Sequence, residues 1–151
     1  MPFYKVLISF LILNFGALGL GSWLMNNGPR SEWYINLNQA PWTPPGWAFG
    51  VAWTLIMICF SVYMAQLYIK FPTKEVITLF ALQFFLNVIW NYVFFNQHLI
   101  LLGFLVIILL TILVCYFFFK FQDIQTRYLL LPYIIWLCIA TSLNGHILIN
   151  N

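Results

Sequence analysis

The stretch "PPGWAFGVAWTLIMICFSVYMAQLYI", Pro44 to Ile69, contains no charged residue. A helix needs about 20 apolar residues to cross the hydrocarbon core of a bilayer, and residues 46–69 are long enough to do so. Two prolines begin the run, where proline favours an extended entry and is tolerated in the first helical turn because its missing N–H is not needed there. The stretch therefore predicts a transmembrane helix with a stiff entry.

Four further uncharged runs extend over the rest of the chain. Of the 151 residues, 64% are hydrophobic and 6% are charged, which is far from the usage of a soluble globular domain. The runs predict spans at about 3–25, 46–69, 76–96, 98–119 and 128–149, with a long first loop over residues 26–45. The apolar stretch within residues 3–25 is too long for the apolar core of a signal peptide. We therefore predict a single membrane domain, residues 1–151, that is all-α and forms a five-transmembrane-helix bundle.

The basic residues predict how the bundle is oriented. On the side of the N-terminus and of the second and fourth loops lie Lys5, Lys70, Lys74, Lys120 and Arg127. The opposite side has only Arg30. Because cytoplasmic loops carry an excess of Lys and Arg, we expect the N-terminus in the cytoplasm and the C-terminus on the opposite side. The net charge of +3 is too sparse for a nucleic-acid surface, so membrane lipid, and not nucleic acid, is the expected surrounding partner.

The spans lack the residues that several kinds of chemistry require. No Asp, Glu, Lys, Arg or His lies well inside a predicted span, which argues against a pump or a proton-coupled carrier. The serines have no buried partner that would activate a nucleophile, so no catalytic residue is expected on this basis. The histidines His98 and His146 stand alone, and we expect neither a metal site nor a bound cofactor. The three cysteines form no CxxC pair and are expected to be inert.

Small, aromatic and amide residues recur on one face in three of the spans. Residues spaced by three or four positions share a helix face. The three stripes are Gly46, Gly50 and Trp53; Gln83, Asn87, and Trp90 or Asn91; and Pro132, Trp136, Ala140 and Asn144. We expect the glycines to let a neighbouring helix approach closely, and the amides to face the bundle interior, with Asn14 and Asn144 as candidate partners. Alternatively, each Asn only holds helices together.

The tryptophans divide into two groups. Trp23, Trp33, Trp42 and Trp47 could form an aromatic belt at the membrane interface, and this role is favoured for Trp23 and Trp47. Trp53, Trp90 and Trp136 lie several residues from the ends of their spans, where an indole N–H must find an acceptor or face a cavity. Deep indoles beside small residues are suited to a flat, largely apolar aromatic ligand.

Three stretches together resemble one known family. They are "PWTPPGWAFGVAW" (Pro41 to Trp53), "WNYVFF" (Trp90 to Phe95) and "PYIIWLCIATSLN" (Pro132 to Asn144), and in order and spacing they resemble the translocator protein or tryptophan-rich sensory protein family, TspO/MBR. "EWYINLNQAPW" (Glu32 to Trp42) is similar to that family's first loop. The resemblance implies a five-helix bundle, commonly a homodimer, with a pocket closed by the loop. Gly46 with Gly50, Ala17 with Gly21, or the apolar face of the third span could form the dimer interface.

The resemblance also implies a membrane receptor or sensor that binds protoporphyrin IX and other tetrapyrroles. Carried over by motif, the ligand-binding residues are Trp33, Trp53, Trp90, Asn91, Trp136, Ala140, Leu143 and Asn144. Two alternatives stay open. Some bacterial members resemble light- and oxygen-dependent porphyrin-degrading enzymes, in which Trp53 and Trp136 would take part, and a tetrapyrrole or apolar solute transporter ranks third. After Asn144 the chain reads "GHILINN", which lacks the Tyr and basic residue of the animal sterol-recognition segment.

Overall fold

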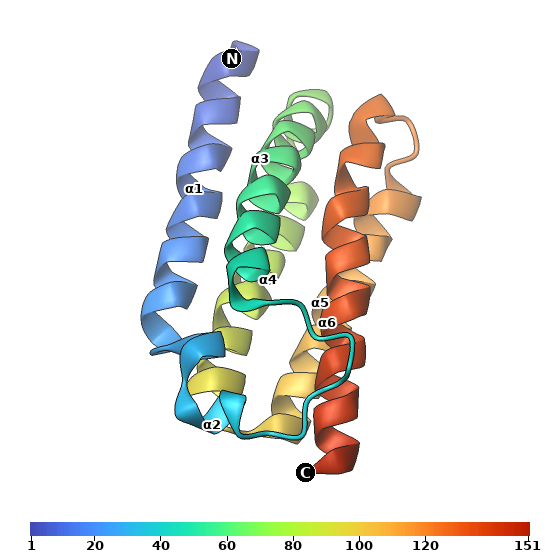
Figure 1. Ribbon diagram of the computed structural model, residues 1–151. Helices are drawn as coiled ribbons and strands as arrows, with labels where there is room; N and C mark the ends of the chain where they lie inside the picture. Colours follow the sequence, from blue (N-terminus) through green and yellow to red (C-terminus); the bar gives the residue numbers. More distant parts are fainter.

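Five long helices lie side by side in the computed structural model, which describes all 151 residues and contains no strand (Figure 1). They are α1 (Phe3–Leu24), α3 (Gly46–Lys70), α4 (Lys74–Asn91), α5 (Ile100–Lys120) and α6 (Leu131–Asn150). Each is long and apolar enough to cross a membrane. The predicted all-α bundle of five spans is therefore confirmed, with helix limits within a few residues of the predicted ones.

The connections between the helices are short, except for the first. Between α3 and α4, the hydroxyl of Thr73 accepts a hydrogen bond from the N–H of Val76 at 3.3 Å and caps α4. At its other end α4 passes into a π-helical turn, Tyr92–Asn96, and the chain then reverses at His98, where φ is +59°. A 3-10 turn, Gln125–Leu130, leads into α6.

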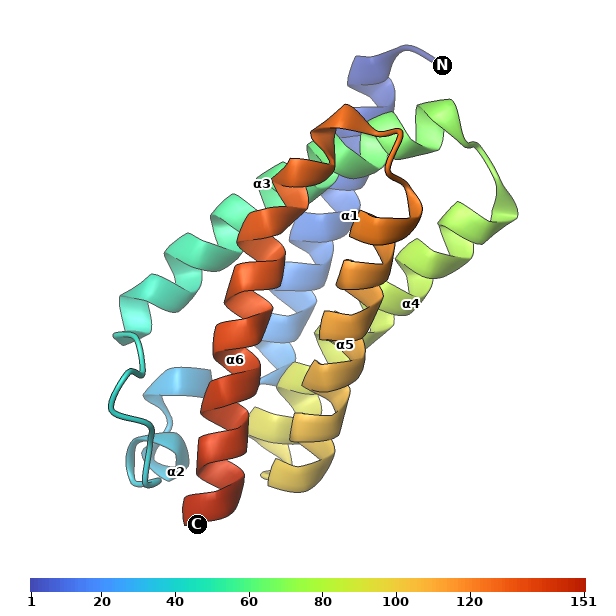
Figure 2. The same ribbon diagram turned by 90° about the vertical axis from the view of Figure 1, so that its right-hand side faces the viewer.

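The first loop contains two short helical pieces, the 3-10 turn η1 (Gly28–Arg30) and α2 (Glu32–Ile35). The hydroxyl of Ser31 caps α2 by accepting a hydrogen bond from the N–H of Tyr34 at 3.2 Å. Beyond α2 the chain runs to the end of α6 before it returns to the start of α3 (Figure 1). Figure 2 shows that α3 is tilted across the bundle, so that its beginning is splayed away from α5.

An aromatic core joins four of the helices further along α3, away from its splayed start. The ring of Phe60 in α3 is fully buried and contacts Phe80 of α4, Phe117 of α5 and Tyr133 of α6, with ring centroids 6.1, 6.2 and 5.3 Å away. Because one ring touches three neighbouring helices, the core fixes their relative positions over the half of the bundle near the N-terminus.

Buried polar side chains pair between helices. The Nδ2 of Asn14 donates to the hydroxyl of Ser61 at 2.8 Å, which joins α1 to α3. The Nε2 of Gln83 donates to the hydroxyl of Tyr133 at 2.5 Å, which joins α4 to α6. The expectation that Asn14 would pair with an amide of the third span is therefore wrong, because α1 packs its Asn14 face on α3. Asn144, by contrast, does meet the third span.

The two ends of the bundle differ in charge. The N-terminus and the α3–α4 and α5–α6 connections lie at one end, and α2 and the C-terminus lie at the other (Figure 1). At the first end Lys120 forms an ion pair with Glu75, and the Nζ of Lys70 donates to the carbonyl of Asp123 at 3.4 Å. The basic residues counted along the sequence thus gather at one end of the folded bundle.

We expect Gly103→Ala to destabilise the bundle, because a Cβ at this position would lie 3.0 Å from the Cβ of Phe94. Overpacking of this kind costs about 1–3 kcal/mol. The thermal unfolding midpoint in detergent should fall for Gly103→Ala. Gly16→Ala is the matched control, since nothing lies within 4 Å of its Cβ position, and its midpoint should be unchanged or slightly raised. Equal falls for both variants would contradict the packing argument.

Candidate ligand-binding site

A cavity of about 620 Å³ lies between the end of α1, the loop, the start of α3 and the end of α4. Small-molecule sites in proteins commonly have volumes of about 300–1,000 Å³, so this space can hold a sizeable organic ligand. Its aromatic wall comes from Trp47, Phe49, Trp53, Trp90 and Phe95. No acidic residue lines it.

Residues at the start of α3 line one side of this cavity. Gly46, Gly50 and Trp53 all line it, so the stripe seen in the sequence does face one space. The predicted reason for the two glycines is wrong, however. A Cβ at either position would meet nothing within 4 Å, so no neighbouring helix approaches there. These glycines instead leave room in the cavity wall beside the indole of Trp53.

A close helix approach does occur at Gly21 of α1. A Cβ at this position would lie 2.6 Å from the Nδ2 of Asn91, so a larger residue here would have to displace the Asn91 amide. The same Nδ2 donates to the carbonyl of Asn87 at 3.0 Å. Asn87 and Asn91 both line the cavity, and Gly21 therefore helps to set the position of its amide wall.

The indole of Trp90 is held from two directions. Its Nε1 donates to the Oδ1 of Asn144 in α6 at 3.4 Å, which supplies the acceptor that a deep indole needs. Its ring stacks on Phe94 in the π-helical turn, with centroids 5.5 Å apart and planes 7° apart. Trp90 thus presents a fixed aromatic surface to the cavity.

The residues carried over from the family motif fall into three places. Trp53, Trp90 and Asn91 line the cavity. Ala140, Leu143 and Asn144 are buried in α6 and do not line it; only Asn144 is linked to it, through Trp90. The remaining two are the indoles Trp33 and Trp136.

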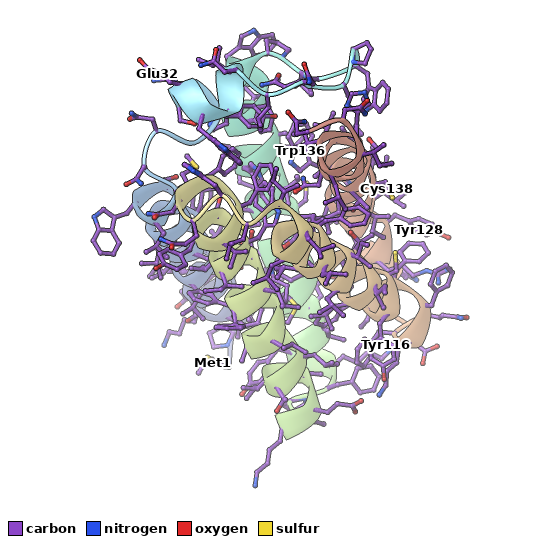
Figure 3. All side chains as sticks on the ribbon, turned by 90° about the horizontal axis from the view of Figure 1, so that it is seen from below. Met1, Glu32, Tyr116, Tyr128, Trp136 and Cys138 are labelled. Atoms are coloured by element: carbon purple, nitrogen blue, oxygen red, sulfur yellow. The ribbon has the colours of Figure 1, made fainter.

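Both of these indoles lie outside the cavity wall. Trp136 is on the side of α6 that faces the start of α3 (Figure 3), where its ring meets the edge of Phe49 at 5.4 Å. Since Phe49 belongs to the wall, Trp136 is one residue removed from the cavity. Trp33 stacks on His98, with centroids 4.0 Å apart, and packs edge-on against Phe94. The loop indole is therefore packed against the α4–α5 turn.

Other residues of the wall were not expected from the sequence. Trp47 is 70% exposed, as expected for an interfacial residue, but it also lines the cavity. Arg30, Asn26 and Asn27 supply polar groups from the loop. In the sequence, only the position of Trp47 between Gly46 and Gly50 indicated that it could line the cavity. Nothing in the local sequence showed that residues 26–30 fold back towards α3.

The loop is fastened to α6. The Nε1 of Trp42 donates to the hydroxyl of Ser142 at 3.0 Å, and the N–H of Asn38 donates to the Oδ1 of Asn151 at 3.0 Å. A second hollow of about 250 Å³ is lined by the loop and shares Pro29, Gly46 and Phe49 with the main cavity. Tyr34, which also lines this hollow, is buried, and the burial raises its pKa to about 12, so its hydroxyl is neutral at physiological pH.

Comparisons with known proteins agree with this architecture. Residues 9–149 match the TspO/MBR family. The chain is 33% identical over 119 residues to Protein CrtK of Rhodobacter capsulatus, covering 74% of each protein. It is 30% identical over 115 residues to the tryptophan-rich sensory protein of Cereibacter sphaeroides, covering 75% of this chain and 73% of the relative. It is 30% identical over 138 residues to the tryptophan-rich protein TspO of Chlorobaculum tepidum, covering 87% of each.

The family match confirms the resemblance of the motifs and extends it over nearly the whole chain. Together with the five helices of membrane-spanning length, it identifies an integral multi-pass membrane protein and supports a sensor or receptor role. The chain belongs to the TspO/MBR family.

Proposed function

We propose that this protein is a membrane receptor or sensor that binds a tetrapyrrole such as protoporphyrin IX in the cavity between α1, α3 and α4. The observation that carries the proposal is that Trp53 and Trp90 line one cavity of about 620 Å³, which two glycines leave open. Flat aromatic molecules gain from contact with indole faces, and a few amides among apolar groups fix their orientation. Asn87 and Asn91 are such amides.

Binding is better supported than the alternative of light-dependent porphyrin breakdown by Trp53 and Trp136. Only Trp53 lines the cavity, whereas Trp136 contacts the wall residue Phe49. A reaction that needs both indoles would require the ligand to extend past Phe49. If the porphyrin is recovered unchanged after illumination with oxygen, only the binding function stands. A new absorbing product that depends on Trp53 would instead support the enzymatic alternative.

We also propose that the N-terminus is cytoplasmic, because five of the six basic residues are at that end of the bundle. The cavity then lies near the opposite face of the membrane.

For the homodimer suggested by the family resemblance, we favour the apolar face of α4, on which Leu82 and Phe85 are exposed. The other two candidate interfaces, Gly46 with Gly50 and Ala17 with Gly21, already have roles within one chain. Gly46, Gly50 and Ala17 line the cavity, and Gly21 packs on Asn91.

We expect Trp53→Phe to weaken protoporphyrin IX binding, because the smaller ring loses stacking area. An aromatic contact is worth about 0.5–1.5 kcal/mol, which predicts an increase in Kd of about two- to tenfold. The titration should follow the absorbance of the porphyrin, so that loss of one indole does not change the reporter. The control is Trp23→Phe, since Trp23 is 75% exposed on α1 and does not line the cavity. Equal Kd values for Trp53→Phe and wild type would contradict the site.

A second test fills the cavity without disturbing the fold. Gly50→Leu adds a side chain where nothing lies within 4 Å of the Cβ position, so it should occupy space that the ligand needs. We expect at least about tenfold weaker porphyrin binding, with an unfolding midpoint that is unchanged or slightly raised. Gly16→Leu is the control, because its Cβ position is equally open but lies outside the cavity. Unimpaired binding by Gly50→Leu would place the ligand elsewhere.

A further inference from the structure

Arg30 lies where the loop meets the cavity and is one of its lining residues. It is exposed, and it is the only Lys or Arg at its end of the bundle. The guanidinium donates no hydrogen bond within the chain and forms no ion pair, even with Glu32 two residues away, since the single salt bridge of the structure joins Lys120 to Glu75. A cation with all its donors unused therefore stands at the edge of a largely apolar space.

The loop and the helices line the cavity with different groups. Asn26 and Asn27 line it beside Arg30, on the loop. Trp53 and Trp90 line it from the helices. The ligand that fits both parts has a planar aromatic body and an anionic edge. Arginine is suited to such an edge because its planar guanidinium donates two parallel hydrogen bonds to one carboxylate.

We propose that Arg30 binds a carboxylate of the ligand and so makes the site selective for planar aromatic acids over their uncharged analogues. The proposal rests on the function proposed above and names the ligand class of the same site. A hydrogen bond to a charged group contributes more than a neutral one, although water and salt near the loop weaken it. The aromatic body then lies against the indoles, and the carboxylate stays at the membrane interface, where its hydration is largely kept.

The test compares protoporphyrin IX with its dimethyl ester, in which both carboxylates are capped. Wild type, Arg30→Gln and Arg30→Lys are titrated with each compound in non-ionic detergent, which contains no lipid phosphate to compete for the guanidinium. We expect Arg30→Gln to bind the diacid about tenfold more weakly and the ester as wild type does. Arg30→Lys should keep part of the affinity for the diacid, because it retains the charge but not the planar pair of donors.

The ratio of the effects on the two compounds is the decisive quantity, because differences in how they partition into detergent cancel in it. Lys5→Gln is the matched control, since it removes a cation at the opposite end, and it should change neither Kd. Equal weakening of diacid and ester by Arg30→Gln, or no weakening of either, would overturn the role of Arg30 while leaving the binding function intact. Failure of wild type to bind either compound would instead overturn the proposed function.

Discussion

Within a bilayer, each buried polar group must find its partner inside the protein, because the hydrocarbon offers none. This constraint organises the whole bundle. Three pairs of polar side chains inside the spans join helices: Asn14 with Ser61, Gln83 with Tyr133, and Trp90 with Asn144. Each pair joins two helices that are distant in the sequence. The pairs therefore specify which faces meet, in a bundle where apolar surface by itself would distinguish poorly between one contact and another.

The cavity exists because the contacts between the helices do not extend to the start of α3. The aromatic core around Phe60 holds α3 against α4, α5 and α6, but the Gly46 end of α3 is splayed, and a Cβ at either of its two glycines would meet nothing within 4 Å. The space is closed on the other side by α4, which is drawn against α1 at Gly21. Tight packing at one glycine and open space at two others thus produce a hollow with a firm wall.

The loop gives this hollow its chemical asymmetry. It is fastened to α6 through Trp42 and Asn38, and it carries Arg30 to the cavity rim. The helices supply aromatic and amide groups, and the loop supplies the one cation. A ligand with a flat apolar body and an acidic edge is complementary to this arrangement, whereas a fully charged or fully apolar molecule would match only one part of it.

Sequence reasoning was reliable for features that depend on composition along the chain. Long uncharged runs determine membrane-spanning helices by length alone, and the spacing of Gly46, Gly50 and Trp53 determines that they share a face. What lies opposite that face depends on how helices tilt and pack, which helical spacing does not encode. The glycines could equally have admitted a helix or left a cavity.

The tertiary structure decided the remaining features. The π-helical turn after Asn91 stacks Phe94 on Trp90, and the folding of residues 26–30 towards α3 places Arg30 beside the indoles. The packing of the helices also places Trp53 in the cavity wall but Trp136, which the motif groups with it, outside the wall and against the ring of Phe49. The sequence by itself determined the five spans and the aromatic, uncharged character of the interior, because these follow from residue type and period. Only the tertiary structure decided which side chains share the cavity, because that depends on contacts between helices far apart in the chain.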